Sequence, residues 1–164
     1  MPIINKKISR ATTMFKQNGI KLKPHQFQAL SWMLNLEKVG KPSGGIIADD
    51  MGLGKTLEII SLLVAKPKDK TLVIVPANLI PQWISEFTKF APHLNVSTEI
   101  SSDIIVRSYV KASRDDALYE ISWGRIVLDE SHLIRNSKCK TYKALSELRS
   151  KHIWCLTGTP IQNS

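Results

Sequence analysis

One segment of the sequence combines glycine, lysine and threonine in a spacing that suits phosphate binding. Residues 44–56 read GGIIADDMGLGKT, which is a short apolar run, a loop with glycines and the start of an apolar segment. Backbone N–H groups at a helix N-terminus bind phosphate oxygens, and glycine lets the backbone approach them. Lys55 would then reach the β- and γ-phosphates of a nucleotide, and Thr56 would place its hydroxyl on magnesium. GKT alone also fits a surface Lys–Thr pair after a flexible turn, but the flanking strand and helix favour a phosphate loop.

Two adjacent carboxylates follow another apolar run. Residues 125–132 read RIVLDESH, so Asp129 and Glu130 stand at the expected end of a strand. In phosphate-loop NTPases an Asp at such a position helps to hold magnesium, and an adjacent Glu can polarise the attacking water as general base. A solvated acidic pair is the alternative, and the phosphate loop earlier in the chain favours the catalytic interpretation. His132 either couples the site to a neighbouring loop or caps a turn.

These residues need a framework that brings distant segments together. Short apolar runs lie at residues 44–48, 71–75, 104–106, 125–128 and 153–156, with a further candidate strand at 95–100. Continuous apolarity is typical of strands covered on both faces, as in a parallel sheet. Segments with helical periodicity lie between the runs, at residues 24–34, 55–65, 81–90, 113–121 and 142–148. The alternation predicts an α/β fold with three layers and a mainly parallel sheet.

Composition narrows the class of protein further. The chain has 164 residues, 43% of them hydrophobic, which fits one domain with a real core rather than a disordered tail. Its charge sum of 23 − 14 = +9 points to a polyanionic partner, with nucleic acid first. Cys139 and Cys155 are too few for a disulfide framework, so we expect reduced thiols in an intracellular protein without signal peptide or membrane span. Four tryptophans have apolar neighbours and are expected in the core: Trp32, Trp83, Trp123 and Trp154.

The motifs, taken in order, resemble those of the Swi/Snf-type helicase-like ATPases of superfamily two. Residues 22–26 (LKPHQ) look like the family's adenine-reading motif, with Gln26 in the place of its glutamine. Residues 49–56 (DDMGLGKT) are similar to its phosphate loop, including Asp49 where the general pattern GxxxxGK[ST] has glycine. Residues 71–76, followed by Gln-Trp at 82–83, resemble its next motif.

The resemblance continues to the end of the chain and covers residues 21–164. Residues 129–132 (DESH) resemble the DEAH box, with Ser131 in place of its alanine, and Asn136 matches the asparagine that follows the box. Residues 156–163 (LTGTPIQN) are similar to the coupling motif. We therefore expect residues 21–164 to form a helicase ATP-binding, RecA-like lobe, truncated at its C-terminal end. Residues 1–20 would be a basic extension, either frayed or forming a flanking helix.

The resemblance implies ATP and magnesium as cofactors and assigns roles to individual residues. The implied nucleotide contacts are Gln26, Asp49, Asp50, Met51, Gly52, Leu53, Gly54, Lys55 and Thr56. The implied catalytic residues are Lys55, Asp129 and Glu130, with Thr56 and Asp129 on the metal and with His132, Thr157, Thr159 and Gln162 in coupling. First-lobe contacts to the DNA backbone would come from Arg107, Ser108 and Tyr109.

Members of this family have two RecA-like lobes, bind double-stranded DNA across both and remodel DNA-bound proteins. The resemblance therefore implies that this chain is the ATP-binding lobe of a DNA-translocating ATPase whose second lobe is missing here. A non-hydrolysing nucleotide- and DNA-binding module is the alternative. A phosphate-loop enzyme acting on small molecules is a third possibility, against which the adenine, acidic and coupling segments argue. The expected location is the nucleus in a eukaryote, and otherwise the cytoplasm or a viral replication site.

Overall fold

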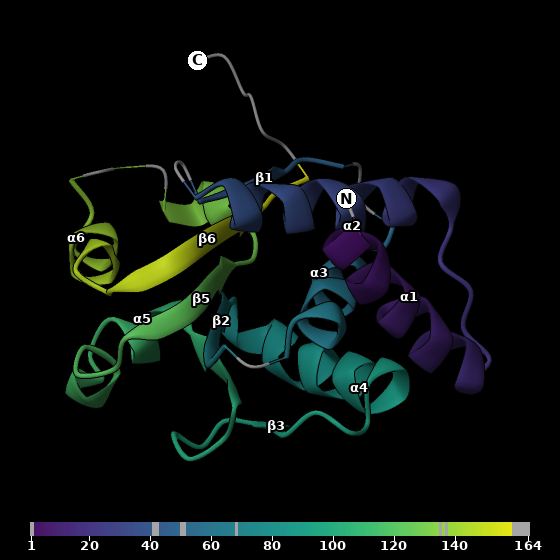
Figure 1. The fold of residues 1–164 in the computed structure, drawn as a ribbon. Helices are drawn as coiled ribbons and strands as arrows, with labels where there is room; N and C mark the ends of the chain where they lie inside the picture. The colour runs from purple at the N-terminus through teal and green to yellow at the C-terminus, as the bar shows by residue number, and fades with distance from the viewer. Residues whose placement is uncertain are drawn as a thin grey trace.

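The computed structural model describes residues 2–40, 43–49, 52–67, 69–134, 136 and 138–158. Helices and strands alternate through most of this part of the chain, which confirms the predicted α/β class (Figure 1). In chain order the elements are α1 (Pro2–Gln17), α2 (Pro24–Val39), β1 (Gly44–Ile47), α3 (Lys55–Ala65), β2 (Thr71–Val75), the 3₁₀ helix η1 (Ala77–Leu79), α4 (Ile80–Phe90), β3 (Val96–Ser97), β4 (Ile104–Ser108), α5 (Tyr109–Ala112), η2 (Asp116–Leu118), β5 (Trp123–Leu128), η3 (Ser131–Ile134), α6 (Lys140–Ser146) and β6 (Ser150–Leu156).

The strands of the described chain form one parallel sheet in the order β1-β6-β5-β2-β4-β3. Every residue of β2 is buried, as its continuous apolar run predicts for a strand covered on both faces. Ser108 of β4 pairs with Val75 of β2, and Leu128 of β5 pairs with Ile74 of β2. Because parallel strands end at the same edge of a sheet, the loops that follow β1, β4 and β5 lie along one edge.

Helices cover both faces of this sheet. In Figure 1, α1, α3 and α4 lie on one side and α5 and α6 on the other. The first group shares the larger hydrophobic cluster with α2, and the second group packs over a smaller cluster. Helix α3 contacts α1, α2 and α4 and buries eight consecutive residues from Glu58 to Ala65. The three layers match the predicted RecA-like lobe.

The basic N-terminal segment forms the flanking helix that was one of the two expectations for it. Four apolar residues recur along one face of α1 and are buried: Ile4, Ile8, Ala11 and Phe15. They belong to the same hydrophobic cluster as α2, α3 and α4, and α1 contacts α3 directly. Helix α1 therefore packs into the core of the lobe.

A buried polar junction joins α2 to the sheet at the edge where the strands begin. Arg125 of β5 donates from Nε and Nη2 to the two carboxylate oxygens of Glu37, at 2.6 and 2.8 Å. The indole N–H of Trp154 donates to the same carboxylate at 3.1 Å, and Lys66 lies 3.1 Å from it. Burial acts to raise the pKa of Glu37, but these donors outweigh burial and hold the pKa at about 2. The junction thus fixes the C-terminal end of α2 against β5 and β6.

Three local expectations were wrong in extent. The helix expected at residues 113–121 is reduced to the short 3₁₀ helix η2 (Asp116–Leu118). A separate turn, α5, precedes it and is capped by Ser108, which accepts from the Lys111 N–H at 3.2 Å. The strand expected at residues 95–100 is reduced to β3. Trp32 is 42% exposed, because it lies over Gly45 of the edge strand β1, where a Cβ would stand 2.9 Å from its ring. Trp83, Trp123 and Trp154 are buried as expected.

Candidate nucleotide site and basic pocket

The phosphate loop connects β1 to α3 as predicted. Gly52 and Gly54 have φ values of 86° and 93°, a left-handed conformation that residues with a Cβ rarely adopt. A Cβ on Gly54 would also lie 2.5 Å from the amide nitrogen of Gln26. Lys55 begins α3, and its Nζ donates to the carbonyl oxygen of Asp49 at 2.6 Å. The ammonium group is therefore held within the loop, next to the helix N-terminus.

The expected adenine-reading residue lies against this loop. Gln26 is buried in the first turn of α2, where its side-chain oxygen accepts from the Lys23 N–H at 3.0 Å. Its amide nitrogen donates to the Leu53 carbonyl at 3.3 Å, and Nε2 of His25 lies 3.1 Å from the same oxygen. The structure thus places Gln26 in direct contact with the phosphate loop. The expected nucleotide contacts Asp50 and Met51 lie outside the described residues.

One buried acid beside the loop was missed by the sequence analysis. Glu58, one turn into α3, has no exposed surface, and its carboxylate oxygens have no hydrogen-bond partner among the described atoms. Burial, together with the nearby charge of Asp49, raises its pKa to about 7, although Lys55 acts in the opposite direction. The available signal was a lone acid within an apolar helical segment (LEIISLLVA).

The acidic pair follows β5 and is held by several hydrogen bonds. Asp129 accepts from the indole N–H of Trp83 at 2.8 Å through Oδ2, and from the N–H of Glu130 at 2.9 Å through Oδ1. Burial raises the pKa of Asp129, while these two bonds and the positive charge of Lys55 lower it in part. Glu130 is the one non-glycine residue of the described chain with a positive φ, at 51°. Nδ1 of His132 lies 3.1 Å from the carboxylate of Glu130.

The predicted coupling residues fall partly within the described chain. Thr157 follows β6, is buried and donates its N–H to the Ile47 carbonyl at 3.1 Å. Because β6 lies between β1 and β5, Thr157 follows the strand that separates the phosphate loop from the acidic pair. Thr56, the second residue of α3, is half-buried. Thr159 and Gln162 lie outside the described residues.

The three residues expected to contact DNA have different environments. Ser108 and Tyr109 are buried, and their hydroxyls bond inside the protein, to the Lys111 N–H and to the Asp129 carbonyl. Both residues also line a pocket of about 240 Å³, so their largely buried side chains border a surface that a ligand can reach. Arg107 lines a larger open pocket, of about 490 Å³, and makes an ion pair with Asp115 at 3.4 Å.

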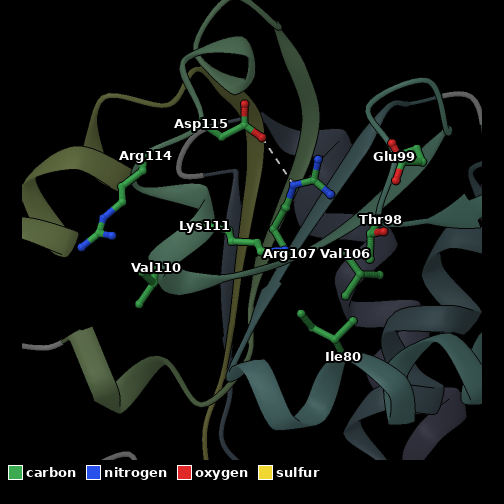
Figure 2. Close-up of a pocket in the computed structure, with 9 residues that line it drawn as sticks. All are labelled: Ile80, Thr98, Glu99, Val106, Arg107, Val110, Lys111, Arg114 and Asp115. Atoms are coloured by element: carbon green, nitrogen blue, oxygen red, sulfur yellow. Dashed lines mark hydrogen bonds and ion pairs between the residues drawn. The ribbon is translucent and has the colours of Figure 1, made fainter.

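This pocket carries basic residues that the sequence analysis did not single out. Lys111 and Arg114, on and just after α5, line it together with Arg107. The acids Glu99 and Asp115 line it as well, and Ile80 and Val106 form an apolar part of its wall. Figure 2 shows Lys111 extending toward Arg107, whereas Arg114 points away from it. Arg107, Lys111 and Arg114 are three or four positions apart along the chain. They line one pocket because the turn of α5 lies between Arg107 and Arg114.

The fold and these two surfaces define a phosphate-loop NTPase lobe of the RecA type. Comparison with known proteins then gives the family: residues 25–164 match the model of the SNF2-related domain, and the chain belongs to this family. The "Probable global transactivator" of Orgyia pseudotsugata multicapsid polyhedrosis virus is 35% identical over 160 residues, which are 85% of this chain and 32% of that protein. The ISWI chromatin-remodeling complex ATPase ISW2 of Saccharomyces cerevisiae is 34% identical over 92% of this chain and 15% of its own length.

A solved structure agrees with this assignment. The Sulfolobus solfataricus SWI2/SNF2 ATPase core in complex with dsDNA superposes with a TM-score of 0.80 at 40% identity, over 88% of this chain and 33% of that one. The chain thus spans about a third or less of these relatives. Within its described residues, no helix has both the length and the apolar character that crossing a membrane requires.

Proposed function

We propose that this chain is the ATP-binding lobe of a DNA-dependent, DNA-translocating helicase-like ATPase that remodels protein–DNA complexes. The observation that carries the proposal is the arrangement at one edge of the sheet, where the phosphate loop follows β1 and the acidic pair follows β5, with only β6 between these two strands. Relatives of the same family include a chromatin-remodeling ATPase and an ATPase core solved with dsDNA, which supports the same function.

The residues at this edge fit Mg²⁺ and ATP by their donor chemistry. Magnesium prefers oxygen ligands, and the Thr56 hydroxyl and Asp129 carboxylate supply them. The Lys55 ammonium donates to an oxygen in the loop, the Asp49 carbonyl. A phosphate oxygen of ATP would be an acceptor of the same kind. Bound Mg²⁺ would neutralise charge on the phosphates. Glu130 would accept a proton from the attacking water as general base.

Duplex DNA is the proposed nucleic-acid partner, contacted at the pocket formed by Arg107, Lys111 and Arg114. The net charge of +9 supports a polyanionic ligand. Contacts of this kind would go to the phosphate backbone and so would show little sequence preference. Their affinity would fall steeply with salt, because neutralised phosphates release counterions. DNA-bound proteins and a second RecA-like lobe are the other proposed partners, in the nucleus or another compartment that contains DNA.

Replacing the phosphate-loop lysine tests the nucleotide site. We expect Lys55→Ala to lower the affinity for a fluorescent ATP analogue with Mg²⁺ by at least about tenfold, since a charge-assisted bond is worth about 1.5–3 kcal/mol. Lys38→Ala, which removes an exposed lysine of α2, is the matched control. Titration of the purified chain measures both variants. An affinity unchanged by Lys55→Ala would contradict the phosphate-loop assignment.

A further inference from the structure

The peptide unit between Asp129 and Glu130 is held at both of its polar ends. Its carbonyl oxygen, on Asp129, accepts from the hydroxyl of Tyr109 at 2.7 Å. Its N–H, on Glu130, donates to the Asp129 carboxylate at 2.9 Å. This unit joins the two residues that we assign to magnesium and to the attacking water. Its orientation therefore sets where both carboxylates point.

The same peptide unit carries backbone strain. Glu130 has a φ of 51°, in the left-handed region that is unfavourable for a residue with a Cβ. Rotating the peptide plane would change φ of Glu130 and relieve the strain, but the rotation would also break the bonds to Tyr109 and to the Asp129 carboxylate. Such balanced arrangements are found at switch regions and active sites. Of the two hydrogen bonds that hold the peptide unit, the one from the Tyr109 hydroxyl comes from another element, α5.

Tyr109 belongs to the turn that forms the wall of the basic pocket. It is the first residue of α5, it is buried, and it lies between Arg107 and Lys111 in the chain. Both of these basic residues line the pocket, as Figure 2 shows. Helix α5 spans only Tyr109–Ala112 and is capped by the Ser108 hydroxyl on the Lys111 N–H. A ligand that shifts the backbone of this turn at Lys111 would therefore also shift Tyr109.

We propose that Tyr109 is a positioning residue that couples duplex DNA bound at the Arg107–Lys111 pocket to the orientation of Asp129 and Glu130. This inference rests on the proposed function, because it assigns DNA to the pocket and Mg·ATP to the acidic edge. DNA on one side of α5 and nucleotide on the other would then each favour one position of the turn. By linkage, each ligand must change the affinity for the other by the same factor.

Tyr109→Phe removes the hydroxyl and keeps the buried ring. The purified chain is titrated with a fluorescent ATP analogue and Mg²⁺, with and without a saturating short DNA duplex, and then with duplex in the presence and absence of nucleotide. In the wild-type chain we expect each ligand to change the affinity for the other by about fivefold. In Tyr109→Phe this factor should fall to less than about twofold. The affinity for each ligand alone should stay within about threefold, because the hydroxyl touches neither.

Tyr142→Phe is the matched control, since it deletes a hydroxyl from a partly exposed tyrosine of α6 and should keep the full coupling factor. If Tyr109 had a merely structural role, Tyr109→Phe would weaken the affinity for each ligand and leave the coupling factor unchanged. That result would overturn the inference. A wild-type chain that binds both ligands independently would also overturn it. A wild-type chain that binds neither ligand would instead overturn the proposed function.

If Tyr109→Phe does not fold, as judged by its thermal unfolding, Ser108→Ala provides a second variant. It removes the cap that ties Lys111 to the start of α5 and leaves the bond from Tyr109 to Asp129 possible. The coupling factor should again fall below about twofold. A coupling factor equal to that of the wild-type chain would overturn the inference.

Discussion

Glu58 is buried beside the phosphate loop without a hydrogen-bond partner among the described atoms, which makes it a source of pH-dependent stability. Its pKa is raised from 4.5 to about 7, so the folded chain binds this proton more tightly than the unfolded chain does. Stability falls with rising pH wherever the native state holds more protons. The contribution of Glu58 to the free energy of unfolding is therefore lost between pH 4.5 and pH 7, and above pH 7 the loss is complete.

Glu58→Gln should flatten this part of the pH profile. The amide does not titrate, so the stability of the variant relative to the wild-type chain should grow by about 3 kcal/mol between pH 4.5 and pH 7. Urea denaturation without nucleotide or Mg²⁺, repeated across this range, measures the difference. Glu120→Gln, at an exposed site, is the control and should follow the wild-type profile. Parallel profiles for Glu58→Gln and the wild-type chain would contradict the prediction.

Among the elements, α1 shows how a segment without any recognised motif can belong to the core. Its sequence is basic, with no acid in the segment PIINKKISRATTMFKQ, and the sequence analysis left a frayed extension open. The structure places its apolar face, which ends at Phe15, against the cluster that also contains α3. Because α3 begins with Lys55, α1 supports the helix that presents the phosphate-loop lysine.

Phe15→Ala should destabilise the lobe by about 3–5 kcal/mol, the usual cost of removing a buried phenyl ring. Phe15 is 1% exposed, so the loss leaves a cavity between α1 and the rest of the cluster. Chemical denaturation of the whole chain provides the measurement. Thr13→Ala, on the exposed side of the same helix, should change stability by less than about 0.5 kcal/mol. If both variants unfold at the wild-type urea concentration, α1 is not part of the cooperative unit.

For the molecule as a whole, the position of its arginines matters for hydrolysis. Among the described arginines, Arg125 is in the buried junction with Glu37, Arg107 and Arg114 line the basic pocket, Arg10 lies on α1 and Arg149 directly precedes β6. None of these five lies in or directly beside the phosphate loop along the chain. In related chemistry an arginine that approaches the bound phosphate from its far side is worth about 10³–10⁵ in rate. The second lobe of the family would supply it.

We therefore expect residues 1–164 alone to bind ATP weakly and to hydrolyse it slowly, with or without DNA. An arginine in that position corresponds to about 4–7 kcal/mol of transition-state stabilisation, since each tenfold in rate is about 1.36 kcal/mol. Nucleotide affinity should fall much less, because the phosphate-loop contacts remain. Steady-state phosphate release, with and without saturating duplex DNA, tests this. Robust DNA-stimulated turnover would contradict the expectation of slow hydrolysis by this lobe, or would show that the chain self-associates to complete its site.

The sequence by itself was sufficient to predict the parallel α/β sheet, the phosphate loop and the acidic pair. These features depend on residues that are close together in the chain. An apolar run followed by GLGKT predicts a strand and a phosphate loop, and an apolar run followed by Asp-Glu predicts a strand that ends in two acids. Because all the strands run parallel, their ends meet at one edge whatever their order. That the loop and the acids share an edge therefore follows from the parallel sheet and does not require the strand order.

Only the tertiary structure decided which side chains from distant parts of the chain touch each other. Tyr109 reaches the Asp129 carbonyl across 20 positions, Trp83 reaches its carboxylate across 46, and Arg125 reaches Glu37 across 88. These contacts depend on β2 lying between β4 and β5, and on the face from which each helix packs. Hydrophobic periodicity is the same for either side of a sheet and for any strand order. It could therefore place Tyr109 at the end of a strand, but it could not show that its hydroxyl turns inward to the acidic pair.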